Sequence, residues 1–158
     1  DWEGVIPDVV LLGKALGGGI IPVSAVVSRD DVLAVLHPGE HGSTFGGNPL
    51  ALAIGREVIR MLREGEMQQR SEELGTAMLE RLRVQAPESV VEVRGKGLWA
   101  GVVTAGGQVT ARQRCEAALR QGVLMKETHE TTLRLAPPLM ISIEDLEHGL
   151  DIVLSVLE

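Results

Sequence analysis

The chain has 158 residues, of which 44% are hydrophobic and 23% are charged, and its formal net charge is −7 at pH 7. This composition fits a globular protein with a core, and no apolar run is long enough to span a membrane. The negative charge argues against a nucleic-acid partner. The only cysteine, Cys115, cannot form an internal disulfide, and the first residues show no targeting signal. The single cysteine predicts a reducing compartment such as the cytoplasm, and a targeting peptide would belong to the part of the protein upstream of this chain.

The first predicted element is a short buried strand, residues 9–12, which delivers a lysine to its end. Gly13 and Lys14 follow the apolar run, and glycines 17–19 end the segment in a loop. A lysine in an apolar setting loses its proton more easily than in water, because desolvation disfavours the charged form. Such a lysine can form a Schiff base. The alternative is a lysine at a strand end that points into solvent.

A glycine-framed loop with two hydroxyls comes next, after a strand predicted at 23–27 and a short helix from Asp30. Ser43 and Thr44 lie in this loop, and Asn48 and Pro49 follow as N-cap and first residue of a helix. Hydroxyls and bare backbone N–H groups near a helix start can bind a phosphate. An ordinary capped turn is the alternative.

The remaining pattern predicts a division of the chain near Gly65. The helix from Pro49 has one apolar face and Gly65 as its C-terminal cap, and a second helix ends before Pro87. Beyond it, strands alternate with helices, which is typical of a small α/β domain. Strands are predicted at 90–93, 98–104, 123–125 and 132–135, and helices at 111–121 and from Ser142, with the face Leu146, Leu150, Val153 and Leu157.

Three further features concern single residue types. Cys115 has helical spacing with apolar neighbours, which predicts a buried structural thiol rather than a nucleophile. The four histidines lack metal-ligand spacing, so no metal site is predicted. Aromatic residues are 2% of the chain, so the core must be aliphatic; they are Trp2, Phe45 and Trp99.

Four separated segments resemble motifs of the class III aminotransferases, which use pyridoxal phosphate. Asp8–Gly19 resembles the cofactor-lysine motif of that family, and Pro38–Leu50 resembles its phosphate-contact loop. Val93–Leu98 and Leu133–Leu139 are similar to two segments of its small C-terminal domain. Within the family, two short sequences resemble the members that act on ornithine more than those that act on acetylornithine. They are residues 38–44 and the pair Thr128-His129.

The resemblance implies a fold and a set of site residues. The fold is fold type I of the pyridoxal-phosphate enzymes, with residues 1–64 as the C-terminal part of the large cofactor-binding domain and residues 65–158 as the small α/β domain. Lys14 would bind pyridoxal 5'-phosphate covalently and act as the catalytic residue. Thr44, and to a lesser degree Ser43, would contact the cofactor phosphate. In the family this threonine serves the neighbouring subunit's site, which implies a homodimer.

Arg134 is the predicted substrate-binding residue. From the sequence alone, an arginine among apolar neighbours is either paired or extends its charged end to solvent. The resemblance implies that it holds a carboxylate of the 2-oxo acid or of glutamate, for which the planar guanidinium fork is suited. Arg94 and Lys96 are interpreted as structural or surface residues, and His129 as a loop residue.

The resemblance also implies that family members are much longer than this chain. The acidic partner of the pyridine nitrogen, the aromatic residue that stacks on the ring and the main phosphate turn would lie upstream of Asp1, so we expect the 158 residues alone to be inactive. Asp8 is interpreted as the residue that begins the first strand, not as that acidic partner. Two alternatives stay open: another enzyme of this fold, such as an acetylornithine aminotransferase or a semialdehyde aminomutase, and a non-catalytic interaction module that has kept the scaffold.

Overall fold

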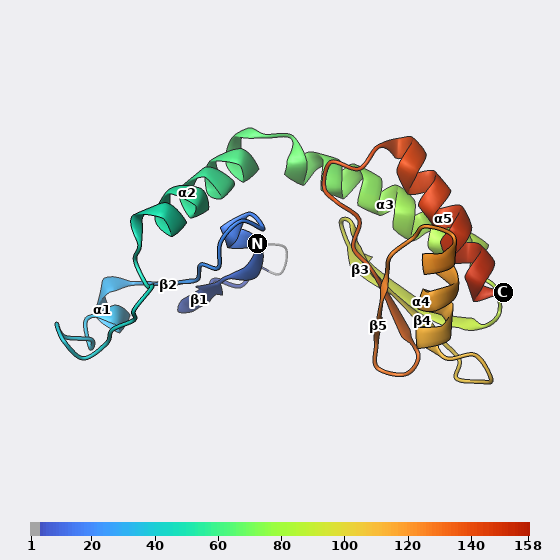
Figure 1. Ribbon diagram of the computed structural model, residues 1–158, viewed down its shortest axis with the longest axis horizontal. Coiled ribbons are helices and arrows are strands. Elements are labelled where there is room, and N and C mark those ends of the chain that lie inside the picture. Colours follow the sequence, from blue (N-terminus) through green and yellow to red (C-terminus); the bar gives the residue numbers. More distant parts are fainter. Residues whose placement is uncertain (1–3) are drawn as a thin grey trace. The chain divides into compact units, whose positions relative to one another are not determined.

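The computed structural model describes residues 4–158, and the chain divides into two compact units, Asp1–Gly65 and Glu66–Glu158. The first unit holds a 2-stranded sheet and the second a 4-stranded sheet (Figure 1). Within the described residues, no helix is both long and apolar enough to cross a membrane. Trp2, one of the three aromatic residues, lies outside the described part of the chain.

From residue 4 onward, the first unit is built from two strands and three helical segments. β1 pairs antiparallel with β2, and the register places Leu12 opposite Ala25. The strand predicted at 23–27 therefore lies at 25–28, because the pairing with residues 9–12 decides which residues are extended. The elements are β1 (Val9–Leu12), the 3-10 helix η1 (Lys14–Gly17), β2 (Ala25–Ser28), α1 (Asp30–Leu33) and α2 (Pro49–Glu64).

The position of β1 was predicted correctly, but its burial was not. All of its residues are exposed, and Leu11 keeps 76% of its accessible surface. The apolar run suggested a buried strand, which needs cover on both faces. Within the first unit β1 pairs only with β2, and the apolar side chains keep water contact.

Helix α2 begins as the sequence predicted. The Asn48 side chain accepts a hydrogen bond from the Ala51 N–H at 2.9 Å, and Pro49 occupies the first helical position. The buried residues of this helix are Ala51 and Gly55, and Gly55 packs beside Leu16 of η1. The predicted apolar face is only partly buried, since Ile54, Val58 and Leu62 are half-buried whereas Leu50 and Met61 are exposed.

The second unit contains the larger sheet and its covering helices. The strand order is β3-β4-β6-β5, and every neighbouring pair is antiparallel. Figure 1 shows α3 and α5 running side by side along this unit. The elements are α3 (Met67–Gln85), β3 (Val90–Lys96), β4 (Trp99–Thr104), α4 (Ala111–Arg120), β5 (Lys126–Thr128), β6 (Thr132–Leu135) and α5 (Ile143–Leu157).

Alternation along the two central strands decides which face of the sheet is the core. Ala100 and Val102 of β4 and Leu133 and Leu135 of β6 are buried, whereas the residues between them face outward. The helices complete this core, which is aliphatic as predicted, since Phe45 and Trp99 are both exposed. The buried helical side chains include Met78, Leu79, Leu82, Leu146, Leu150, Val153 and Leu157.

Helix starts in this unit use side-chain caps. Ser142 caps α5 by accepting from the Asp145 N–H at 2.9 Å, as the sequence predicted. Thr110 and Gln113 form a full capping box at α4 that was not predicted. Each cap satisfies backbone N–H groups that have no partner inside the helix, and so fixes where the helix begins.

The strand predicted at 123–125 is wrong. The chain turns at Gly122, whose φ is +95°, and the Val123 N–H then bonds to the Ala118 carbonyl oxygen at the end of α4. The strand β5 begins only at Lys126, where pairing with β6 starts. Val123 and Met125 are apolar because they pack against the core, not because they belong to the sheet.

A close backbone contact fixes α3 against the turn between β3 and β4. A Cβ atom added at Gly75 of α3 would lie 2.1 Å from the Gly97 carbonyl carbon, far inside contact distance. The Ser71 hydroxyl, one helical turn earlier, accepts a hydrogen bond from the Leu98 N–H at 3.2 Å. The absence of a side chain at Gly75 is therefore a condition for this contact.

We expect Gly75→Ala to destabilise the chain by about 1–3 kcal/mol, because the methyl group forces the turn away from the helix. Helix propensity alone predicts the opposite, a gain of about 1 kcal/mol. Gly149→Ala in α5 is the matched control, since a Cβ there meets nothing within 4 Å. Urea denaturation of the three chains measures both effects. Equal effects of the two substitutions would contradict the close contact.

Candidate functional site

Lys14 has an unusual backbone conformation. Its φ is +49°, and among the described non-glycine residues only His129 shares a positive φ. Left-handed backbone is disfavoured for a residue with a Cβ, and it persists where the surrounding structure enforces it, often at functional sites. Here the enforcement comes from a tight turn, in which the Leu16 N–H bonds to the Gly13 carbonyl oxygen at 3.1 Å.

The Lys14 side chain is exposed and makes no hydrogen bond or ion pair with residues 4–158. The apolar, desolvated setting expected for this lysine is thus not supplied by the first unit. Lys14 lines a cavity of about 460 Å³ whose walls come from three separate segments of the chain. The other lining residues are Pro22, Val23, Ser24, Ser43, Phe45, Gly46, Gly47, Asn48, Ala51 and Leu52.

The hydroxyl loop reaches this cavity through Ser43. The Ser43 hydroxyl accepts a hydrogen bond from the Gly46 N–H at 3.0 Å, which closes a tight turn before α2. Its own O–H remains available to donate to a ligand. Thr44 is exposed and is not one of the residues that line the cavity. The two hydroxyls that the sequence grouped together therefore have different surroundings in this unit.

Ser24 is a polar residue of the cavity that the sequence did not single out. It follows Pro22 and Val23, and its Cβ lies 3.8 Å from the position a Cβ would take on Gly13. The antiparallel pairing explains this, because Leu12 opposite Ala25 places Gly13 opposite Ser24. Only the register of the β1–β2 pair could have pointed to Ser24, and the residue pattern alone did not give this register.

Asp8 lies at the start of β1, away from Lys14 at the other end of the strand. Its carboxylate forms an ion pair with Arg29 at 2.6 Å, and the Ser28 hydroxyl donates to its backbone carbonyl oxygen at 2.5 Å. These contacts join the beginning of β1 to the end of β2. Asp8 therefore has the structural role that was predicted for it.

Arg134 lies in β6 of the second unit, on the outward face of the sheet. Its neighbours Leu133 and Leu135 are buried in the core, which holds the strand and directs the arginine outward. Arg134 is exposed and has no hydrogen-bond or ion-pair partner among residues 4–158. Of the two alternatives for an arginine among apolar residues, the second applies: the charged end is in solvent.

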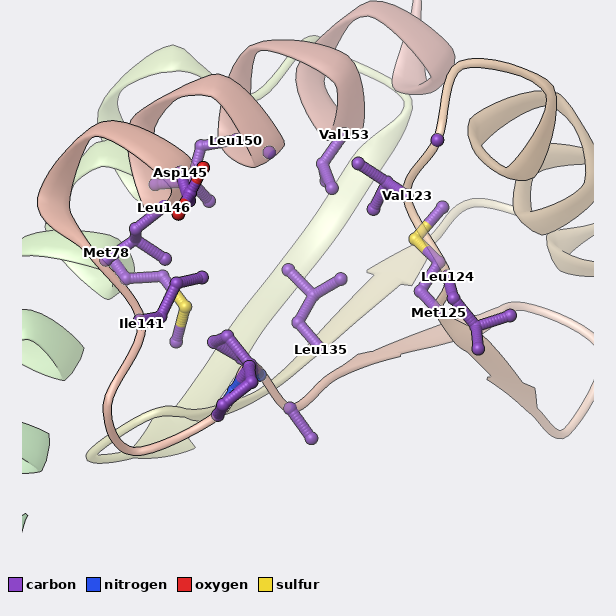
Figure 2. A pocket seen from close by; sticks show the side chains of 15 residues that line it. Met78, Val123, Leu124, Met125, Leu135, Ile141, Asp145, Leu146, Leu150 and Val153 are labelled. Carbon is purple, nitrogen blue, oxygen red and sulfur yellow. The ribbon is translucent and has the colours of Figure 1, made fainter.

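The second unit contains another cavity, of about 310 Å³, between α5 and the segments around Leu124 and Pro138. Figure 2 shows that the side chains around it are almost all apolar, among them Met78, Leu135 and Ile141. Its one carboxylate, Asp145, accepts a hydrogen bond from the Ser142 hydroxyl at 2.6 Å and belongs to the cap of α5. This cavity holds no group that could do chemistry.

Two other expectations concern metals and thiols. Within the described residues, no cluster of histidine, cysteine or carboxylate side chains could hold a metal ion. Cys115 is buried, and this burial raises the pKa of its thiol, so the reactive thiolate is disfavoured. The predicted structural role of Cys115 is confirmed.

Comparisons with known proteins agree on one family. The chain matches the model of the aminotransferase class-III family over residues 1–157. The ornithine aminotransferase of Geobacillus sp. (strain WCH70) is 47% identical over 157 residues, which are 99% of this chain and 38% of that protein. The ornithine aminotransferase of Exiguobacterium sp. (strain ATCC BAA-1283 / AT1b) is 46% identical over the same shares, 99% and 38%.

Solved structures give the same result. The ornithine delta-aminotransferase of Plasmodium falciparum has a TM-score of 0.92 at 42% identity, over 98% of this chain and 40% of that one. The acetylornithine aminotransferase of Elizabethkingia anophelis has a TM-score of 0.88 at 38% identity, over 99% and 42%. This chain spans about two fifths of the length of these relatives. Because the family model matches residues 1–157, the chain belongs to the class III aminotransferases.

Proposed function

We propose that this chain is part of an ornithine–oxo-acid aminotransferase, which moves the δ-amino group of ornithine to 2-oxoglutarate through pyridoxal 5'-phosphate. The products would be glutamate 5-semialdehyde and glutamate. The observation that carries the proposal is the cavity that brings Lys14, Ser43 and the start of α2 together. The ornithine aminotransferases among the relatives, at 46–47% identity, support the choice of substrate.

The residues of this cavity fit a phosphorylated aldehyde. Lys14 supplies a primary amine with no partner in the described chain, which is the group that condenses with an aldehyde. Ser43 offers a free O–H, and the N-terminus of α2 adds the positive end of a helix dipole, which favours a phosphate. The related ornithine aminotransferase of Toxoplasma gondii, 35% identical, has pyridoxal phosphate at partial occupancy in its active site.

When bound, pyridoxal phosphate supplies the electron sink for the amino-group transfer. Lys14 would hold this cofactor through its side-chain amine, and the same amine, once released, would accept and return the proton that moves during the transfer. The left-handed backbone at Lys14 fixes the direction in which its side chain leaves the turn. Thr44 would donate a hydrogen bond to the phosphate in the partner subunit's site, and Ser43, the lesser candidate, would donate to the phosphate beside Lys14.

Arg134 would bind a carboxylate of the 2-oxo acid or of glutamate. Its guanidinium can donate two parallel hydrogen bonds to a carboxylate, and nothing in the described chain occupies it. The buried leucines on either side hold its backbone in the sheet, so the fork is presented from a rigid strand. The planar fork itself is pre-organised for a carboxylate, so less freedom is lost for each hydrogen bond that forms.

The wider setting is proposed on the same basis. Residues 1–64 would be the C-terminal part of the large cofactor-binding domain and residues 65–158 the small domain, which the division after Gly65 supports. The protein would act as a homodimer in which Thr44 serves the partner subunit's site, in keeping with its exposure away from the Lys14 cavity. A lone cysteine suits the cytoplasm.

A second candidate is an acetylornithine aminotransferase, because a structure of that kind is 38% identical over 99% of this chain. The two enzymes differ in whether the donor's α-amino group is free or acetylated. A panel of amine donors on the full-length protein distinguishes them. Faster turnover of acetylornithine than of ornithine would replace the first proposal with the second.

In the full-length protein loaded with pyridoxal phosphate, borohydride reduction should attach the cofactor to Lys14. The chain's other lysines, Lys96 and Lys126, lie on the sheet of the second unit and are the internal controls. Peptide mapping by mass spectrometry identifies the modified residue. Lys14→Ala should also abolish transamination. Cofactor found on Lys96 or Lys126 would remove Lys14 from the proposed site.

Thr44→Ala should weaken cofactor retention more than it slows the chemistry. Loss of one hydrogen bond to a charged phosphate costs about 1.5–3 kcal/mol, or roughly 10- to 150-fold in affinity. Equilibrium dialysis of pyridoxal phosphate against the full-length variant measures this change. Thr44→Ser keeps the hydroxyl and should restore most of the affinity. If Thr44→Ala binds the cofactor like the unmodified protein, Thr44 makes no phosphate contact.

A further inference from the structure

One row of residues crosses the outward face of the second sheet. Arg94 of β3 is the register partner of Gly101 in β4, Gly101 is the partner of Arg134 in β6, and Arg134 is the partner of Lys126 in β5. Register partners in a sheet project from the same face at the same height. The side chains of Arg94, Arg134 and Lys126 are all exposed. The row therefore presents positive charges on either side of a glycine.

Gly101 is not explained by its backbone or by lack of space. Its φ is outside the left-handed region, and a Cβ added there would lie 3.7 Å from Arg94 Cγ and 3.8 Å from Thr132 Cγ2, which are ordinary contacts. Glycine inside a strand costs stability and marks places where a ligand approaches the backbone closely. With glycine here, β4 carries no side chain of its own beside Arg134, and the Arg94 side chain lies next to this position.

The charges of the row are unequally neutralised. Arg94 is paired with Glu92 at 2.6 Å and Lys126 with Glu127 at 2.7 Å, whereas Arg134 has no partner in the described chain. Lys126 and Arg134 also stand directly opposite each other, an arrangement of like charges that destabilises a sheet. An anion over Gly101 would relieve this repulsion and would occupy Arg134.

We propose that Gly101 keeps open the floor of a carboxylate-binding site, and that Arg94 is its second cation beside Arg134. The Arg94 side chain already lies against this floor, since both its Cγ and its Nε are 3.7 Å from the Cβ position of Gly101. A carboxylate has more acceptor sites than one guanidinium fork uses, so a second arginine can bind it as well. This inference rests on the proposed function and makes Arg94 a specificity-determining residue for the 2-oxo acid.

The test uses the full-length protein and glutarate, a five-carbon dicarboxylate with no amine or keto group. Calorimetry gives its dissociation constant without any turnover. Arg94→Gln should raise this constant roughly 1.5- to 5-fold, the range expected for one exposed charge contact. Gly101→Ala should also raise it, because the added methyl group takes up space that the carboxylate would use. Glu92→Gln should leave it unchanged or lower it, because it removes a competing negative charge. Arg120→Gln, an exposed arginine at the end of α4, is the control and should have no effect.

Kinetics and stability separate this role from a structural one. Arg94→Gln should raise KM for 2-oxoglutarate without changing KM for ornithine, and Arg94→Lys should recover part of the loss. Gly101→Ala should be at least as stable to heat as the parent, because alanine is no worse in a strand. If Arg94→Gln and Glu92→Gln weaken glutarate binding equally, the ion pair only supports the sheet and the proposal is wrong.

The remaining outcomes also decide between the two proposals. Unchanged glutarate binding in both Arg94→Gln and Gly101→Ala would overturn the carboxylate site even if the enzyme transaminates ornithine. Glutarate binding that depends on Arg94 and Gly101, in a protein that does not transaminate ornithine, would leave the site standing and remove the proposed function.

Discussion

The second unit depends on the antiparallel register between β4 and β6. This pairing places Ala100 opposite Leu135 and Val102 opposite Leu133, so that one face of the sheet is uniformly apolar and can be covered by the helices. The same register directs Gly101 and Arg134 to the other face. A shift by one residue would reverse both faces at once, bury the arginine and expose the leucines. Core formation and the presentation of Arg134 are therefore one structural event.

The first unit is held together differently, by tight turns, and it buries few side chains. Its exposed apolar strands contribute little to a core of their own, and its order rests on local hydrogen bonds and close contacts between small residues. Gly55 lets η1 pack against α2, and Asn48 and Ser43 close the loop that leads into the helix. These contacts bring Lys14 and the hydroxyl loop to one cavity even though the unit is small.

Glycine has three different roles in this chain. At Gly122 it permits a positive φ that turns the chain after α4, and at Gly75 it allows two backbones to touch. At Gly101 neither reason applies, and its proposed role is to leave room for a carboxylate beside Arg134. In the sequence alone, a glycine indicates a turn, a break or a close backbone approach without telling these roles apart. Only the surroundings of each one show which role it has.

The sequence by itself determined most of the elements and the identity of the chemical groups. Strong periodicity and caps located α2 and α5, whereas the neighbours of Lys14 left two alternatives, a Schiff-base lysine or a lysine that points into solvent. Local signals were insufficient at 123–125, where apolar residues pack on the core without pairing, and at β1, where an apolar run is exposed. The tertiary structure alone decided that Ser24 joins Lys14 at one cavity and that Arg94 shares a row with Arg134. The physical reason is that helix periodicity and caps are local, whereas strand register and burial depend on residues far away along the chain.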